Sequence, residues 1–344
     1  MWTTFFFKFG QFVILNYLFI NTKHWNQKKL DNLGMPFINQ PINPNIPNTI
    51  CYLNGEFGPL REAKISVLDR GFIFGDGVYE VVPSYYGQPF RFDQHMARLE
   101  KSLKELRIPN PYSKDDWLKL VEQLALHFAQ TSKQNIDQSQ QIIYIQISRG
   151  VAPRDHIMTP DCVPTVFMMA NPFKPVSAEI RLTGVKCISA HDFRWEKAHI
   201  KSTSLLGAVF ARQISADVGA TETIMFRGNY LSEASSSNVW IVKNGTVFAP
   251  PKDHLLLEGI RYGLLEEICK SQNIPFSLQK ISKQEVFDAD EVLLSSASKE
   301  VLPVSQIDDK LVGLNTPHPG KPGPIYKQLH LAYSASVDKN CKRN

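Results

Sequence analysis

Two Asn-Gly dipeptides, each placed between short apolar runs, constrain the fold most strongly. Asn54-Gly55 lies early in the chain, and Asn244-Gly245 lies in its second half. Both residue types tolerate the positive φ angles that a tight hairpin turn requires. The dipeptides therefore predict antiparallel β-hairpins in both halves. The runs expected to pair are residues 50–53 with 56–60 and residues 239–242 with 246–248, and further turns are expected at residues 85–90 and 226–230.

Helical patterns interrupt these strands. Asp93 is expected to cap a helix that places Met96 and Leu99 on one apolar face. Ser113, followed by Asp116, is expected to start a second helix. This mixture of hairpins and amphipathic helices predicts an α+β fold. Two further helices are expected over residues 205–218 and 259–271, and two further strands over residues 142–148 and 165–170.

The two sets of elements are joined by the Pro-containing stretch 171–175, which predicts two domains with a cleft between them. We expect a small first domain, an interdomain linker and a larger second domain, flanked by an extension and a tail. The predicted boundaries are 1–50 for the extension, 51–170 for the first domain, 171–180 for the linker, 181–315 for the second domain and 316–344 for the tail.

Composition excludes several classes of function. The 344 residues are 43% hydrophobic and 21% charged, as in ordinary globular proteins. The net charge is +5, but Lys and Arg are spread along the chain without a basic run among aromatic residues. Nucleic acid is therefore not expected as a partner. The five cysteines lack short spacings, which argues against a zinc site or a disulfide framework and favours a reducing, cytoplasmic compartment without a bound metal.

The first 34 residues form an unusual segment. Residues 5–20 are apolar but interrupted by polar residues, and the run is short for a membrane span. It also lacks a basic n-region and a small-residue cleavage site. A weak signal or anchor is an alternative. We favour translation from Met35, with the preceding segment absent or disordered, and expect no membrane partner.

Lys201 and Glu233 are the strongest candidates for chemistry. Lys201 stands where residues 195–200 give way to small residues and a helical pattern, and Glu233 follows in a Ser-rich stretch. An amine that forms a Schiff base and a carboxylate that keeps a pyridine nitrogen protonated are the groups that a pyridoxal phosphate site needs. From the residues alone, Lys201 could equally be a solvated surface charge, and Glu233 could cap a turn.

Four motifs in order carry a resemblance to a known family. They are residues 69–80 (DRGFIFGDGVYE), residues 149–156 (RGVAPRDH), the stretch around Lys201 and the stretch around Glu233. Together they resemble the D-amino acid aminotransferases, which are class IV aminotransferases of fold type IV. The resemblance runs from about Tyr52 to Val304. It implies a two-domain α+β enzyme whose second domain binds pyridoxal 5'-phosphate in a cleft between the domains.

The resemblance also implies roles for individual residues. Lys201 resembles the Schiff-base lysine and proton shuttle, Glu233 the partner of the pyridine nitrogen, and Arg98 a ligand of the cofactor phosphate. From the residues alone, Arg98 could also be a helix charge paired with Glu80 or Asp93.

A second group of residues matches the family's substrate site. Tyr79, Arg154 and His156 resemble the residues that bind the substrate α-carboxylate. In the family the last two come from the neighbouring subunit, so the resemblance implies a homodimer with shared active sites. Arg154 offers a planar, always charged fork suited to a carboxylate. Without the motif, Arg154 could simply pair with Asp155, and Tyr79 could be a sheet residue.

The phosphate-binding turn departs from the family pattern. Gly259-Ile260 matches it, but Arg261 follows where many members have threonine. The main-chain N–H groups could still bind phosphate at a helix start, while Arg261 could replace a hydroxyl contact with charge. Ser296 resembles a late hydroxyl near the phosphate. Ala234 stands where many relatives have glycine.

The implied activity is transamination of D-amino acids, with D-alanine and 2-oxoglutarate giving pyruvate and D-glutamate by a ping-pong mechanism. The fold does not choose between D and L substrates. A branched-chain L-amino acid aminotransferase and a 4-amino-4-deoxychorismate lyase are the alternative enzymes. A non-catalytic binding protein is a third alternative, and the intact Lys201 and Glu233 argue against it.

Overall fold

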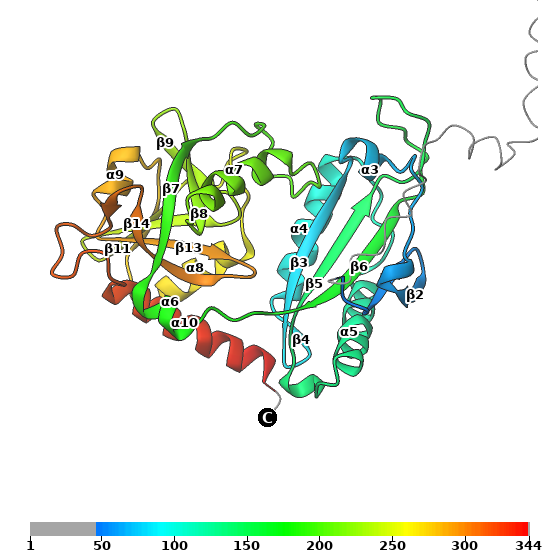
Figure 1. The fold of residues 1–344 in the computed structure, drawn as a ribbon, viewed down its shortest axis with the longest axis horizontal. Helices are drawn as coiled ribbons and strands as arrows, with labels where there is room; N and C mark the ends of the chain where they lie inside the picture. The colour runs from blue at the N-terminus through cyan, green and yellow to red at the C-terminus, as the bar shows by residue number, and fades with distance from the viewer. Residues whose placement is uncertain (1–45, 343–344) are drawn as a thin grey trace, which may run out of the picture. The chain divides into compact units, whose positions relative to one another are not determined.

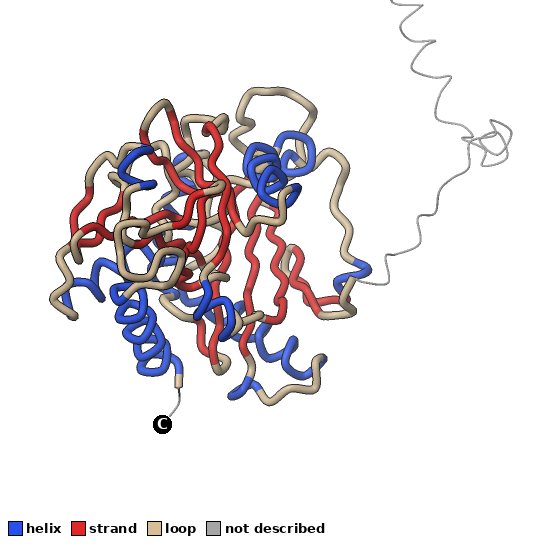
Figure 2. The backbone as a smooth tube through the Cα atoms, turned by 60° about the vertical axis from the view of Figure 1, so that its left-hand side comes forward, coloured by secondary structure: helices blue, strands red, loops and turns tan. Residues whose placement is uncertain are grey.

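The computed structural model describes residues 46–342. A compact unit begins at Pro47 and contains two β-sheets with helices packed on their outer faces (Figure 1). Figure 2 shows the strands gathered together in the interior and most helices on the outside. The predictions for residues 1–34, including translation from Met35, lie outside the described residues, as does nearly all of the predicted extension 1–50.

The first sheet has six strands in the order β2-β1-β6-β5-β3-β4, and every neighbouring pair is antiparallel. The predicted first hairpin is confirmed, because Asn54 and Gly55 have φ angles of 48° and 103° between β1 and β2. The strands are β1 (Ile50–Leu53), β2 (Glu56–Pro59), β3 (Gly77–Tyr85), β4 (Gln88–Pro89), β5 (Gln140–Ser148) and β6 (Thr165–Pro172).

Helices α4 (Phe92–Glu105) and α5 (Lys114–Thr131) cover this sheet and pack their apolar stripes into one core with it. Ser113 caps α5 as predicted, since its side chain accepts a hydrogen bond from the Asp116 N–H. The predicted cap of α4 is wrong. Arg91, in a left-handed conformation with φ of 56°, occupies that position, and Asp93 lies in the first turn. A carboxylate there still interacts favourably with the helix dipole.

The second sheet has nine strands, in the order β12-β11-β10-β13-β14-β7-β8-β9 with β15 paired to β14. The hairpin predicted at Asn244-Gly245 is confirmed, with φ angles of 50° and 75° between β10 and β11. The strands are β7 (Val185–His191), β8 (Glu222–Arg227), β9 (Tyr230–Ala234), β10 (Asn238–Lys243), β11 (Thr246–Ala249), β12 (Phe276–Leu278), β13 (Glu291–Ser296), β14 (Glu300–Ile307) and β15 (Lys310–Leu311).

Two hydrophobic cores flank the second sheet. One packs β10 and β13 against α8 and α10, with Trp240 and Tyr262 at a ring-centroid distance of 4.3 Å. The other gathers apolar side chains of β7, β8, β13 and β14 around Ile281 and Val286. The helices of this half are α6 (Ala178–Thr183), α7 (Leu206–Asp217), α8 (Ile260–Ser271), α9 (Lys283–Phe287) and α10 (Pro324–Cys341).

Two segments differ from the simple domain prediction. The stretch expected as a tail, residues 316–344, contains α10, which buries Tyr326, Leu329 and Tyr333 against the second sheet. Strand β6 runs on to Pro172, so the linker starts later than predicted, and α6 begins at Ala178. The other helices and strands for which bounds were predicted begin and end within a few residues of those bounds.

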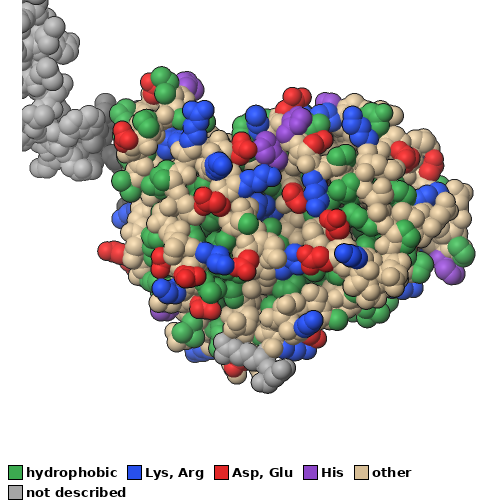
Figure 3. All heavy atoms as spheres, turned by 180° about the vertical axis from the view of Figure 1, so that it is seen from behind, with side chains coloured by type: hydrophobic (Ala, Val, Ile, Leu, Met, Phe, Trp, Pro, Cys, Tyr) green, Lys and Arg blue, Asp and Glu red, His purple; other side chains and the backbone are tan. Residues whose placement is uncertain are grey.

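On the face shown in Figure 3, acidic and basic side chains are interspersed. All five cysteines are free. Within residues 46–342, no helix combines the length and the apolar character needed to cross a bilayer.

Candidate active site

A pocket of about 1220 Å³ opens between the two sheets. Its walls come from the end of α3 (Arg70–Phe74), from β3 and α4, and from the loop that leads into α7. The second sheet contributes the end of β9, the start of α8 and the turn over residues 295–298. Lys201, Glu233, Tyr79 and Arg98, all predicted as site residues, line this one pocket.

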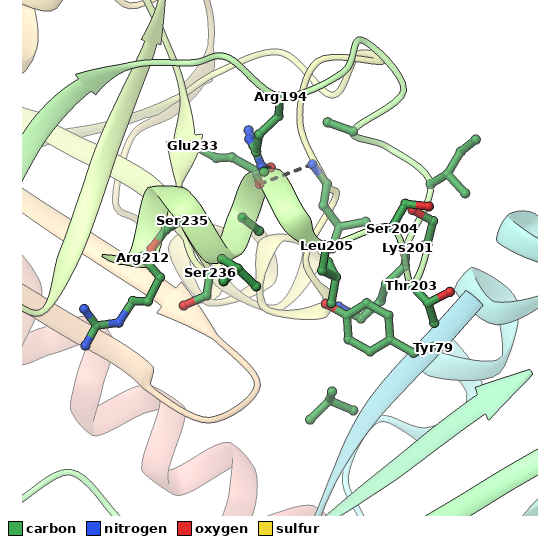
Figure 4. Close-up of a pocket in the computed structure, with 18 of the residues that line it drawn as sticks. Tyr79, Arg194, Lys201, Thr203, Ser204, Leu205, Arg212, Glu233, Ser235 and Ser236 are labelled. Atoms are coloured by element: carbon green, nitrogen blue, oxygen red, sulfur yellow. Dashed lines mark hydrogen bonds and ion pairs between the residues drawn. The ribbon is translucent and has the colours of Figure 1, made fainter. Parts of the chain in front are cut away.

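Lys201 lies on an extended segment that is hydrogen-bonded to the edge of β3. Its carbonyl accepts from the Tyr79 N–H at 2.9 Å, and its own N–H donates to the Ser102 hydroxyl at 3.3 Å. The Lys201 ammonium lies over the Tyr79 ring, 4.1 Å from the centroid (Figure 4). Among the described residues, no carboxylate lies within ion-pair distance of it. The amine is therefore held in the pocket without a fixed partner.

Glu233 lies near the end of β9 and is 5% exposed. One carboxylate oxygen accepts from Arg194 at 2.7 Å. The other accepts from the Asn238 amide at 3.3 Å and from the Leu257 N–H at 3.2 Å. Burial raises the pKa of Glu233, while the Arg194 charge and these hydrogen bonds oppose that rise. Together these contacts hold the carboxylate in one orientation.

Arg194 is a site residue that the sequence reasoning missed. Figure 4 shows its guanidinium directed at Glu233, and Asp192 fixes it from behind with two hydrogen bonds of 3.0 Å. The neighbouring arginine holds the pKa of Asp192 at about 2, so Asp192 stays ionised. The only sequence signal was the short Asp-x-Arg spacing, which is common on surfaces.

The start of α8 presents main-chain N–H groups that no side chain caps. Gly259 is its N-cap. An added Cβ at Gly259 would lie 2.2 Å from the Asn238 side-chain oxygen, so glycine is needed for this close approach. The first N–H groups of a helix lack intrahelical acceptors and attract negative charge. Gly259 and Ile260 lie on the pocket wall, and their binding of a phosphate stays a prediction.

Arg98 was expected as a phosphate ligand or as a helix charge paired with Glu80 or Asp93, and the structure shows the pairing with Glu80. It lines the pocket, yet it also pairs with Glu80 of β3 through two hydrogen bonds of 2.7 and 2.9 Å. A further N–H donates to the Glu258 carbonyl at 3.0 Å. Glu80 is fully buried and also contacts His95 Nδ1 at 2.7 Å. The two neighbours lower the pKa of Glu80 strongly, so it stays ionised despite its burial.

Arg261 and Ser296 both line the pocket. The Arg261 guanidinium is buried in the core behind α8, against the rings of Phe90 and Tyr333. Ser296 accepts a hydrogen bond from the Lys299 N–H at 3.1 Å, which shapes the 295–298 turn. Ala234 is a buried strand residue and leaves this geometry intact.

Arg154 and His156 do not reach the pocket of their own chain. Both are exposed on the loop after β5, and both lie against Phe74, which lines the pocket. Among the described residues, no ion pair joins Arg154 to its neighbour Asp155, whose carboxylate accepts a hydrogen bond from the Ile157 N–H at 3.1 Å. Within one chain the three residues predicted to bind the α-carboxylate are therefore divided, with Tyr79 on the pocket wall and the other two outside it.

The donor set fits pyridoxal 5'-phosphate. An amine without a carboxylate partner, a fixed carboxylate and an uncapped helix start share one pocket. His95 adds a fully buried Nε2 atom without a hydrogen-bond partner among the described residues, also on the pocket wall. Unpaired polar atoms at such depth are costly unless a ligand or water satisfies them. Lys201, Glu233 and the 259–261 turn would hold the amine-reactive, ring-nitrogen and phosphate ends.

Comparison with known proteins places these features in one family. Residues 77–307 match the family model described as amino-transferase class IV. The D-alanine aminotransferase of Staphylococcus haemolyticus is 34% identical over 291 residues, which is 84% of this chain and 98% of that relative.

Solved structures share the fold. The branched-chain amino acid aminotransferase of Escherichia coli superposes with a TM-score of 0.73 at 24% identity, covering 84% of this chain and 94% of that one. A Legionella pneumophila structure named for 4-amino-4-deoxychorismate lyase gives 0.68 at 21% identity, covering 80% and 96%. At such identities the likeness concerns the fold alone.

Proposed function

The chain belongs to the class IV aminotransferases, and we propose that it transfers the amino group of D-amino acids with pyridoxal 5'-phosphate as cofactor. The observation that carries this proposal is the convergence of Lys201, Glu233 and the uncapped start of α8 on one pocket. The D-alanine aminotransferase relatives support the choice of substrate.

The cofactor, when bound, supplies an aldehyde that condenses with amines and a ring that accepts electrons from the substrate α-carbon. Lys201 would hold it and, once displaced by a substrate amine, act as the base that moves the α-proton. The Tyr79 ring beneath the ammonium limits where that amine can swing.

Glu233 would keep a proton on the ring nitrogen, because an adjacent negative charge favours the protonated, cationic form. Arg194 acts as a positioning residue in this step. It fixes the carboxylate and opposes the rise in pKa that burial causes.

We propose that Arg154 and His156 complete the site of a second copy of the chain. Their loop is exposed, and it carries solvent-facing Val151, Ile157 and Val163. Apolar residues of this kind at a loop tip suit burial against a partner. An exposed guanidinium could then bind the substrate α-carboxylate with a charge-assisted, bidentate contact.

Two tests address the substrate and the reaction type. Purified protein would be offered D- and L-alanine, D- and L-leucine, and 4-amino-4-deoxychorismate, each with and without 2-oxoglutarate. We expect D-alanine with 2-oxoglutarate to react fastest. Faster L-leucine turnover would favour the branched-chain enzyme. Pyruvate release from aminodeoxychorismate without a 2-oxo acid would favour the lyase.

The shared site is tested by mixing two variants that are each impaired. Arg154→Ala removes a contact typically worth about 1.5–3 kcal/mol, so kcat/KM for D-alanine should fall at least about tenfold. Subunit exchange between Arg154→Ala and Lys201→Ala should restore activity, because a hybrid dimer holds one intact composite site. Proven exchange without recovered activity would refute the sharing.

A further inference from the structure

Arg261 is a buried charged side chain on the pocket wall that, within the described part of the chain, lacks acceptors for most of its N–H groups. It is 1% exposed, and neither its Nε nor its Nη1 has a hydrogen-bond acceptor among the described residues. Its Nη2 reaches the Ala297 carbonyl only at 3.5 Å. The guanidinium carbon lies 5.2 Å from the Phe90 ring centroid and 5.7 Å from that of Tyr333. Such contacts attract a cation but do not neutralise it.

The surroundings leave this charge without a full counter-ion. Burial raises the pKa values of Tyr85 and Tyr333, so both phenols stay neutral. His95 has a pKa of about 4 and is also neutral near pH 7, and burial raises the pKa of Cys341 to about 11, which keeps that thiol neutral too.

The charge of Glu300 acts on Arg261, but Glu300 is already paired with Arg181. Two guanidinium groups therefore share one carboxylate, and the cluster of Arg181, Glu300 and Arg261 carries a net charge of about +1 in a low-dielectric region.

The position of Arg261 relates this excess charge to the pocket. Its own N–H belongs to the uncapped first turn of α8, and Ala297 lies in the 295–298 turn on the same pocket wall. The guanidinium therefore lies behind both of these turns, on the side away from the pocket. Tyr333, on α10, packs against it from the other side.

We propose that Arg261 is a positioning residue for the phosphate end of the cofactor, acting from behind the turn. It holds the two turns together and supplies buried positive charge that a dianion at the start of α8 would balance. Charge thus replaces the hydroxyl contact that the family resemblance led us to expect. The inference rests on the proposed cofactor.

The test compares cofactors with and without a phosphate. Arg261→Met keeps much of the length and volume of the side chain but removes the charge. Pyridoxal 5'-phosphate and pyridoxal would be titrated into the apo form of the full chain, with binding followed by absorbance. We expect the Kd for the phosphate form to rise at least about tenfold in Arg261→Met, while that for pyridoxal changes less than about twofold. Equal weakening of both would overturn the proposal.

Arg91→Met is the matched control. Arg91 also binds α8, through two hydrogen bonds of 2.8 Å to Glu267, but it does not line the pocket. Its loss should leave the ratio of the two Kd values unchanged. If wild-type protein binds neither cofactor, the proposed function fails. If it binds both and Arg261→Met keeps the wild-type ratio, only the role of Arg261 fails.

Glu300→Gln tests the sign of the effect even where Arg261→Met does not fold. It removes the only carboxylate of the cluster and raises the net charge there. An electrostatic role predicts that the phosphate form binds as tightly as in wild type or about threefold tighter, relative to pyridoxal. A Kd ratio weakened about tenfold would show that the cluster matters for its shape rather than its charge, and would contradict the proposal.

Discussion

The two sides of the pocket balance their buried charges in different ways. On the side of the first sheet, Arg98 and Glu80 form a two-bond ion pair, and His95 adds a neutral third member. On the side of the second sheet, Arg261 and Arg181 share the single carboxylate of Glu300. The charges of Arg98 and Glu80 on the first side balance each other, whereas the second side has an excess of positive charge. The difference supports the proposal that the second-sheet side binds an anion, while the ion pair of the first-sheet side keeps the opposite wall rigid.

The largest expected effect separates two lysines near the pocket. Lys299 is bound to Glu222 at 2.6 Å, while Lys201 lies over Tyr79 without a carboxylate partner among the described residues. Lys201→Ala should lower transaminase activity by about 10⁴-fold, because the covalent attachment and the proton shuttle are lost together. Borohydride reduction followed by peptide mapping should find the cofactor on Lys201. Label on Lys299 would remove the basis for assigning the unpaired amine to catalysis.

The next largest effect is a loss of stability on the side of the first sheet, where Arg98 and Glu80 are paired. Glu80→Gln leaves the mostly buried Arg98 without its counter-ion, and breaking a buried pair in this way costs up to about 3–5 kcal/mol. Urea denaturation should show this loss in free energy of unfolding. Glu300→Gln should cost less, because the Glu300 side chain is 11% exposed while that of Glu80 is 0% exposed. Equal losses in the free energy of unfolding for Glu80→Gln and Glu300→Gln would contradict the difference in charge balance between the two sides.

A smaller effect concerns acid stability. Burial lowers the pKa of His95 to about 4, below the value of about 6.5 in an unfolded chain. As the pH falls from about 6.5 towards 4, His95 becomes protonated in the unfolded state but stays neutral in the folded state. The free energy of unfolding therefore decreases over this range. The loss attributable to His95 is at most about 3 kcal/mol. His95→Gln should flatten the pH dependence of unfolding in this window, and an unchanged slope would contradict a neutral His95.

The smallest effect concerns Arg194. Without its charge the pKa of Glu233, already raised by burial, rises further, and less of the carboxylate is ionised near pH 7. Arg194→Met should therefore lower kcat by about tenfold at pH 7 and recover part of the loss as the pH rises. A uniform loss at every pH would assign Arg194 a purely structural role.

The local elements could be read from the sequence because their signals are local. Asn54-Gly55 and Asn244-Gly245 fix two hairpins through positive φ angles, and Ser113 caps α5 through its own hydroxyl. Helix α10 was missed because polar residues lie between its buried Tyr326 and Tyr333, so no clear apolar stripe stands out in the sequence. Its stability comes from packing on a sheet that is distant in the chain.

The site could be predicted only in part. Lys201 and Glu233 belong to motifs, so they could be named before the fold was known. Arg194 and the environment of Arg261 depend on contacts between segments far apart in the chain. Arg154 and His156 remain predictions, because their partner would be a second copy of the chain.

The most direct measurement is a single half-reaction with the cofactor-loaded protein and no 2-oxo acid. D-Alanine should be converted to one equivalent of pyruvate per active site, and the visible absorbance of the lysine-linked cofactor should disappear in step. L-Alanine should do so at least about a hundredfold more slowly. Faster reaction with L-alanine, or pyruvate beyond one equivalent without an acceptor, would contradict D-amino acid transamination at Lys201.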